Sequence, residues 1–87
     1  MRYEAAQAGT LESSDCLVTL APSGEFSFEY RSGNGGLFAE RTEAMVRGIL
    51  EHYGNPCFRV QILDQGALEA TLRARLEIAL ERALRKE

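Results

Sequence analysis

The sequence lacks the features that mark membrane, nucleic-acid-binding and secreted proteins. It contains no run of about 18 apolar residues, so we expect no membrane span. Its formal net charge is −3 with acids and bases interspersed, whereas a nucleic-acid-binding protein usually concentrates Lys and Arg in a basic patch. The N-terminal residues carry no apolar segment of the secretory type. These absences predict a cytoplasmic protein that binds neither a membrane nor a nucleic acid.

Cysteine and histidine are too scarce for a credible metal centre. The chain has two cysteines, Cys16 and Cys57, and one histidine, His52, with neither a CxxC nor an HxxxH spacing. We therefore predict no metal site. Both cysteines are expected to be thiols in a reducing cytosol, and because each opens an apolar run, both are expected to be buried. His52 is expected near a helix C-terminus, where an imidazolium complements the helix dipole.

The sequence also lacks the motifs of a self-sufficient enzyme, so no catalytic residue is predicted. There is no GxSxG nucleophile elbow, and the single histidine has no evident triad partner. The glycine-rich segment 32–36 lacks the lysine and hydroxyl residue of a P-loop and is interpreted as a flexible connection. Eighty-seven residues predict a single domain, residues 1–87, with one modest core. A carrier, a binding module or a subunit of an assembly is therefore favoured over an enzyme.

Hydrophobic patterning predicts two strands in the first third of the chain. Residues 1–8 are expected to be a loosely held terminus. Residues 16–21 are rich in β-forming residues, and residues 25–30 alternate aromatic with polar side chains, so each segment predicts a strand. The turn residues 22–24 lie between them. We expect these two strands to form a hairpin.

The remainder of the chain alternates helix and strand. Residues 37–53 have the apolar spacing of a helix that ends at the Gly-Asn-Pro segment 54–56. Residues 58–62 alternate as a third strand, and residues 67–85 have the spacing of a last helix. The order strand, strand, helix, strand, helix predicts an α+β fold, with a small, largely antiparallel sheet packed on one face by two helices.

One polar loop carries the candidate chemistry. Ser13 lies between Glu12 and the turn-forming Ser14 and Asp15, where its side chain should be exposed. An exposed serine can anchor a cofactor when a separate enzyme attaches a phosphate-linked group, because the carrier then needs accessibility and no catalytic base. The other interpretation is an ordinary solvent-exposed turn, and the residues by themselves favour it.

Two blocks of the sequence resemble a known carrier family. Residues 8–15, Ala-Gly-Thr-Leu-Glu-Ser-Ser-Asp, resemble the N-terminal signature of the acyl carrier (gamma) subunit of citrate lyase, and residues 66–77 resemble the second block of that family. The two blocks occur in the family's order and bracket nearly the whole chain. The resemblance implies that Ser13 carries a phosphoribosyl-dephospho-CoA group through a phosphodiester. It also implies a small residue, serine or glycine, at the next position, which Ser14 satisfies.

The same resemblance implies three partners and a reaction cycle. A transferase (alpha) subunit exchanges the acetyl group on the cofactor thiol for citryl, and a lyase (beta) subunit cleaves the citryl thioester to oxaloacetate and regenerates the acetyl thioester. A separate prosthetic-group transferase attaches the cofactor. The chain itself is then a non-catalytic carrier, and neither cysteine takes part.

Alternatives remain open at this point. The carrier subunit of malonate decarboxylase uses the same type of cofactor, although the segment 10–12 before Ser13 favours the citrate lyase group, and citramalate lyase is not separated from that group by the carrier sequence. A carrier of the helical-bundle type is disfavoured, because its Asp-Ser-Leu motif is absent. A different class is a non-covalent protein-interaction domain that docks a partner through Arg75, Ile78 and Arg82 on one flank of the last helix.

Overall fold

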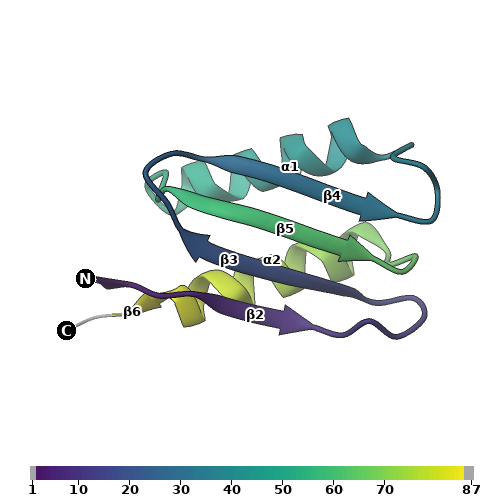
Figure 1. Ribbon diagram of the computed structural model, residues 1–87, viewed down its shortest axis with the longest axis horizontal. Helices are drawn as coiled ribbons and strands as arrows, with labels where there is room; N and C mark the ends of the chain where they lie inside the picture. Colours follow the sequence, from purple (N-terminus) through teal and green to yellow (C-terminus); the bar gives the residue numbers. More distant parts are fainter. Residues whose placement is uncertain (1, 86–87) are drawn as a thin grey trace.

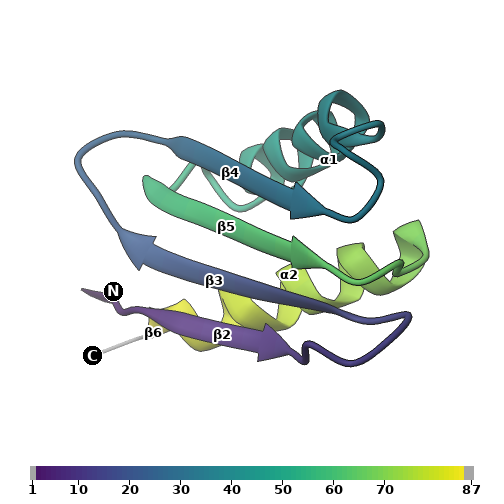
Figure 2. The same ribbon diagram turned by 45° about the vertical axis from the view of Figure 1, so that its right-hand side comes forward.

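The computed structural model describes residues 2–85, which form a four-stranded sheet with two helices on one of its faces (Figures 1 and 2). The elements follow in this order: β1 (Arg2–Tyr3), β2 (Ala6–Gly9), β3 (Cys16–Pro22), β4 (Ser27–Ser32), α1 (Ala39–His52), β5 (Phe58–Asp64), α2 (Glu69–Ala83) and β6 (Leu84–Arg85). β1 and β6 pair antiparallel and bring the two ends of the described chain together. The predicted α+β architecture is confirmed.

The order of the sheet is β2-β3-β5-β4, which overturns the predicted hairpin between residues 16–21 and 25–30. β5 lies between these two strands, antiparallel to β3 and parallel to β4. The hairpin prediction was wrong because alternation identifies the buried face of a strand but not its neighbour. Phe58, Val60 and Ile62 make β5 apolar along its whole buried face, so a central position suits it best. Since β2–β3 and β3–β5 are antiparallel, the sheet is largely antiparallel, as predicted.

The N-terminal segment is a strand, which overturns the loosely held terminus predicted for residues 1–8; Met1 lies outside the described residues. β2 pairs with β3, Ala8 is buried, and the ring of Tyr3 lies 5.4 Å from the ring of Phe58. The Ala-Gln-Ala-Gly sequence of β2 has little apolar signal. β2 is an edge strand, and α2 packs closely against it, as Figure 1 shows from the side of the sheet. The small side chains of β2 make this close packing possible.

Both helices begin two residues later than the sequence predicted, at Ala39 and Glu69, and neither has a side-chain cap at its N-terminus. For α2 the cause is Asp64, the last residue of β5. Its Oδ1 accepts hydrogen bonds from the backbone N–H groups of Gly66 (3.0 Å) and Ala67 (2.8 Å). These bonds hold residues 64–67 in a turn, so the helix starts after it.

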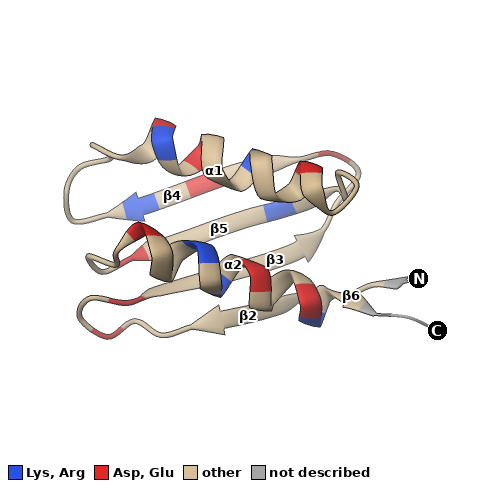
Figure 3. Ribbon diagram, turned by 180° about the vertical axis from the view of Figure 1, so that it is seen from behind, with Lys and Arg blue, Asp and Glu red and all other residues tan. Residues whose placement is uncertain are grey.

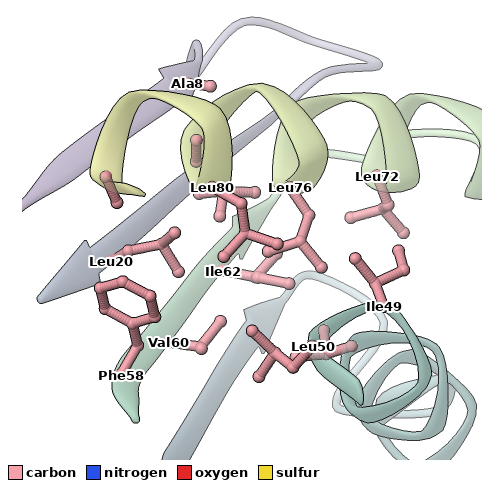
Figure 4. Packing of buried hydrophobic residues seen from close by; sticks show 14 of the residues in the cluster. Ala8, Leu20, Ile49, Leu50, Phe58, Val60, Ile62, Leu72, Leu76 and Leu80 are labelled. Atoms are coloured by element: carbon pink, nitrogen blue, oxygen red, sulfur yellow. The ribbon is translucent and has the colours of Figure 1, made fainter. Parts of the chain in front are cut away.

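The core lies between the sheet and the helices, where leucines of α2 meet Leu20, Ile62 and the apolar face of α1 (Figure 4). Cys16 is fully buried in this core, as predicted, but Cys57 is exposed, and its predicted burial was wrong. Cys57 immediately precedes β5, and the alternation of that strand starts at Phe58. Between residues 2 and 85, no helix combines the length and apolarity needed to cross a membrane.

Candidate functional site: the Ser13 turn

Ser13 lies in a tight turn between β2 and β3. The backbone N–H of Asp15 donates to the carbonyl oxygen of Glu12 at 3.1 Å, which closes a four-residue turn. Ser14 has a φ of 67°, the left-handed conformation that the third residue of a type II turn requires. Glycine adopts this conformation most easily, which agrees with the small residue that the family resemblance implies at this position. Ser13, the second residue of the turn, is exposed, as predicted.

The turn is attached to the loop that follows β5. The N–H of Ser14 donates to the carbonyl oxygen of Gln65 at 2.7 Å, and the N–H of Gln65 donates to the carbonyl oxygen of Asp15 at 2.8 Å. These two hydrogen bonds, one from Ser14 and one to Asp15, continue the contact between the two chain segments beyond the last paired residues of β3 and β5, Cys16 and Asp64. Loops that are far apart in the sequence therefore lie side by side at one end of the molecule (Figure 1).

Asp15 is the side chain that holds the turn together. Its carboxylate accepts hydrogen bonds from the Thr10 hydroxyl (2.7 Å) and the N–H of Cys16 (2.7 Å). It also accepts two from Arg75 of α2, one from Nε at 3.1 Å and one from Nη2 at 3.0 Å. Such a two-point contact between guanidinium and carboxylate fixes orientation as well as distance. The turn that carries Ser13 is thereby locked onto α2.

These contacts stabilise the ionised carboxylate. The hydrogen bonds from Arg75, then those from Thr10 and from the backbone of Cys16, lower the pKa of Asp15 from 3.8 to about 2. The same pair raises the pKa of Arg75, chiefly through its hydrogen bond to Asp15. The Asp15 carboxylate and the Arg75 guanidinium are therefore both charged throughout the neutral pH range.

Gly9 makes room for this arrangement at the end of β2. Its φ is +104°, and a Cβ atom there would lie 1.9 Å from the carbonyl oxygen of Cys16 and 3.3 Å from Cδ of Arg75. The carbonyl oxygen of Cys16 accepts a hydrogen bond from the backbone N–H of Thr10 at 3.1 Å. After this bond the chain leaves the sheet and enters the loop that contains Ser13. Only glycine allows the two strands and the arginine to approach so closely.

The loop after β5 is itself rigidly built. The hydroxyl of Tyr30 on β4 donates to Oδ2 of Asp64 at 2.6 Å, while Oδ1 holds the turn at residues 66–67. Burial, and then this hydrogen bond, raise the pKa of Tyr30. Gln65, the residue that holds the Ser13 turn, is therefore fixed from both β4 and β5.

The arrangement presents the Ser13 hydroxyl without activating it. Among the described residues, no side chain or backbone group makes a hydrogen bond to that hydroxyl. His52 ends α1 next to the start of β5, at the end of the molecule opposite the Ser13 turn (Figure 1). A serine nucleophile would require a base within hydrogen-bonding distance. Within the described part of the chain, the Ser13 hydroxyl therefore has no base beside it.

Comparisons with known proteins agree with a carrier. Curated relatives named citrate lyase acyl carrier protein include one from Treponema denticola, which is 36% identical over 93% of each chain. Another, from Haemophilus influenzae, is 41% identical over 90% of this chain and 82% of its own. A third, from Serratia proteamaculans, is 42% identical over 90% of this chain and 78% of its own. The chain belongs to the citrate lyase acyl carrier protein family. Its role is accordingly that of a carrier.

The carrier is also similar to proteins of malonate decarboxylase. Residues 3–83 match the family model described as "Malonate decarboxylase delta subunit (MdcD)". A chain in the crystal structure of a Pseudomonas malonate decarboxylase hetero-tetramer in complex with malonate is 27% identical, with a TM-score of 0.76 over 92% of this chain and 84% of that chain. The carrier therefore shares its fold with this malonate decarboxylase chain. Its sequence identity to the citrate lyase carriers, 36–42%, is higher than its identity to that chain, 27%.

Two residues of the predicted docking flank make contacts within the carrier itself. Arg75 binds Asp15, and Nη1 of Arg82 donates to the carbonyl oxygen of Gln7 on β2 at 2.8 Å. Ile78, between them, is 38% exposed. Two of the three residues therefore tie α2 to β2 and to the Ser13 turn. Charges of both signs lie along the two helices on this side (Figure 3).

The two cysteines of the carrier lie in contrasting environments. Burial, and then the nearby carboxylates of Asp15 and Asp64, raise the pKa of Cys16 to about 11. Cys16 is therefore a thiol at neutral pH and has low reactivity. Cys57 is exposed at the start of β5. Among residues 2–85, no three His, Cys, Asp or Glu side chains gather as a metal site would require.

Sequence reasoning missed Gly9, Asp15 and Arg75 as parts of the site. Asp15 and Gly9 stand inside the first block of the family, and Arg75 stands inside the second, at residues 66–77. In the structure, the contact between Asp15 and Arg75 joins the two blocks.

Proposed function

We propose that this protein is the acyl carrier subunit of a citrate lyase complex and carries phosphoribosyl-dephospho-CoA on Ser13. The observation that carries the proposal is an exposed, unengaged serine hydroxyl on a turn locked by residues from both family blocks. The site fits the group, because a phosphodiester requires only an accessible oxygen atom on the carrier. A locked turn also offers a modifying enzyme a constant shape to recognise.

Attachment exchanges one oxygen–phosphorus bond for another. Oγ of Ser13 bonds to a phosphorus atom of an activated donor, the bond from that phosphorus to its leaving group breaks, and the hydroxyl proton passes to a base of the prosthetic-group transferase. The base must come from the transferase, because the Ser13 hydroxyl has no hydrogen-bonding partner among the described residues. The attached group supplies the thiol that carries the acyl group.

The carrier then serves two partners by tethering. The alpha (transferase) subunit exchanges acetyl for citryl on the arm, and the beta (lyase) subunit releases oxaloacetate from the citryl thioester. A tether replaces diffusion with a high effective concentration, commonly in the millimolar range for short flexible links. A small domain with a fixed attachment turn is sufficient for this task.

The proposal is tested by co-expression with the prosthetic-group transferase and its donor pathway, followed by intact mass measurement. The wild-type chain should gain the mass of the phosphoribosyl-dephospho-CoA group, and Ser13→Ala should gain none. Ser13→Ala should change the free energy of unfolding by no more than about 0.5 kcal/mol, because the side chain is exposed. Ser14→Ala is the matched control and should still be modified. An adduct mapped by peptide sequencing to Ser14 or Thr10 would reject the assignment.

A second candidate function is the carrier of a malonate decarboxylase, which the family match over residues 3–83 favours. The two functions are distinguished by reconstitution of the loaded carrier with each set of partner subunits. We expect citrate cleavage with the citrate lyase alpha and beta subunits and no malonate decarboxylation with the other set. The reverse result would select the second candidate.

A further inference from the structure

A shallow depression of about 360 Å³ lies on the open face of the sheet, beside the Ser13 turn; its lining includes Leu11, Arg31, Leu63 and Gln65. We refer to it as the open-face depression. Both helices cover the opposite face, so nothing in the described chain lies over this one (Figures 1 and 2). The space is therefore accessible to a group attached at Ser13.

The open-face depression is continuous with the attachment turn. Leu11 belongs to the same loop as Ser13, and Gln65 makes the two backbone hydrogen bonds that hold the turn. Arg31 and Leu63 are direct register partners, and Leu63 is in turn opposite Leu17. Register partners share a face of the sheet, so these side chains form one row at the end where the Ser13 turn begins.

The lining combines apolar surface with a cation and with Asp64, whose buried carboxylate already accepts three hydrogen bonds. Leu11 is 56% exposed, although it is a large apolar residue. The side chain of Arg31 is 74% exposed, and its Nε donates to Glu29 at 2.5 Å. Among the described residues no partner engages its two Nη atoms, which leaves four N–H groups for an anion. No other Lys or Arg lines the depression.

We infer that the open-face depression is a resting site for the nucleotide portion of the arm on Ser13, with phosphate held by Arg31 and the flat base and sugar lying on Leu11 and Leu63. This inference rests on the proposed function. A guanidinium pairs well with phosphate oxygens, and leucine side chains accept the face of a heteroaromatic ring. One exposed arginine binds a free anion weakly, but a tethered anion is present at a high effective concentration. The arm of the carrier therefore rests in the open-face depression when it is not bound to a partner subunit.

The first test compares backbone amide spectra of the unmodified and the loaded wild-type chain. Binding in the open-face depression should shift the amide signals of Ser32, Gly33 and Leu63 in addition to those of residues 11–15. Shifts confined to residues 11–15 would overturn the inference and leave the attachment site intact. Absence of an adduct in the intact mass would instead reject the proposed function, so the two failures are distinguishable.

The second test uses two arginine variants of the loaded chain. Arg31→Ala should speed removal of the arm by an added phosphodiesterase by about two- to fivefold, the size expected for loss of one exposed charge contact. Arg59→Ala is the matched control, since Arg59 is an exposed arginine on β5 and pairs in register with Ser27 at the other end of β4. It should leave the removal rate unchanged. Equal rates for the two variants would overturn the inference.

Discussion

At the scale of single residues, Gly9 decides how closely β2, β3 and α2 approach at the base of the Ser13 turn. A methyl group at this position meets a backbone carbonyl oxygen at 1.9 Å, and a backbone atom cannot move away as a side chain can. The positive φ adds strain for any other residue.

Gly9→Ala should therefore lower the free energy of unfolding by about 2–4 kcal/mol, as measured by chemical denaturation. Gly48→Ala provides the contrast, because Gly48 lies within α1 and a Cβ there meets nothing within 4 Å. It should raise stability by about 0.5–1 kcal/mol. Equal effects of the two substitutions would contradict the close contact at Gly9.

Asp15 makes part of the stability of the carrier sensitive to acid. Its pKa is lower in the folded chain, about 2, than the ordinary value of 3.8. A lowered carboxyl pKa stabilises the fold fully above the unfolded value, and this contribution is lost as the pH falls through the folded value. The melting temperature of the wild type should thus drop between about pH 4 and pH 2. Asp15→Asn should show a smaller drop in that window.

The control for this titration is Glu12→Gln in the same turn. The Glu12 carboxylate makes no hydrogen bond to the described residues, so its loss should leave the acid transition of the wild type unchanged. If Asp15→Asn followed the wild-type curve between about pH 4 and pH 2, the lock with Arg75 would not be the source of the acid sensitivity.

At the scale of elements, Asp64 joins β4, β5 and the start of α2. It is buried, and its carboxylate accepts hydrogen bonds from Tyr30, Gly66 and Ala67. The loop that it holds contributes Gln65 to the Ser13 turn. The Ser13 turn is therefore positioned by one loop and one helix from the C-terminal half of the chain.

Asp64→Ala should lower the free energy of unfolding by about 2–4 kcal/mol, because it leaves three donors without their acceptor. Tyr30→Phe, which removes only one of these bonds, should cost about 1 kcal/mol. Thermal or denaturant unfolding of both variants measures the difference. If Tyr30→Phe lowered the free energy of unfolding as much as Asp64→Ala, the hydrogen bonds that Asp64 accepts from Gly66 and Ala67 would not be what stabilises the loop.

At the scale of the whole molecule, several arginines of the carrier are already paired with carboxylates, which disfavours a site for a small polyanion such as citrate. Arg41, Arg47 and Arg75 each pair with a carboxylate, with N···O distances of 3.5, 2.9 and 3.0 Å, respectively. The exposed Arg31 pairs with Glu29 through Nε, which leaves only its Nη groups for an anion.

The isolated chain should accordingly neither cleave citrate nor bind it at millimolar concentration, whether or not Ser13 is loaded. Titration calorimetry and an oxaloacetate assay measure the two properties. Addition of the alpha and beta subunits to the loaded chain should restore cleavage, and Ser13→Ala is the negative control. Cleavage by the purified chain alone would contradict a carrier role.

The family resemblance and the exposure of Ser13 could be predicted from the sequence because both are local properties. The signature at residues 8–15 is read directly, and a Ser-Ser-Asp segment favours an exposed turn whatever surrounds it. The burial of Cys16 and the apolar alternation of residues 58–62 were also readable from local pattern. The attached group on Ser13 stays a prediction.

Local pattern by itself determined the three strands β3, β4 and β5 and the two helices, where the polar loop lies and which family the chain resembles, but not the strand β2. Only the tertiary structure decided that β5 separates the strands at residues 16–21 and 25–30, and that Arg75 holds Asp15 across 60 positions of sequence. The physical reason is that periodicity records which side of an element is buried, whereas strand neighbours and ion pairs depend on competition among all apolar faces for one core. In this carrier that competition sets the shape of the turn that presents Ser13.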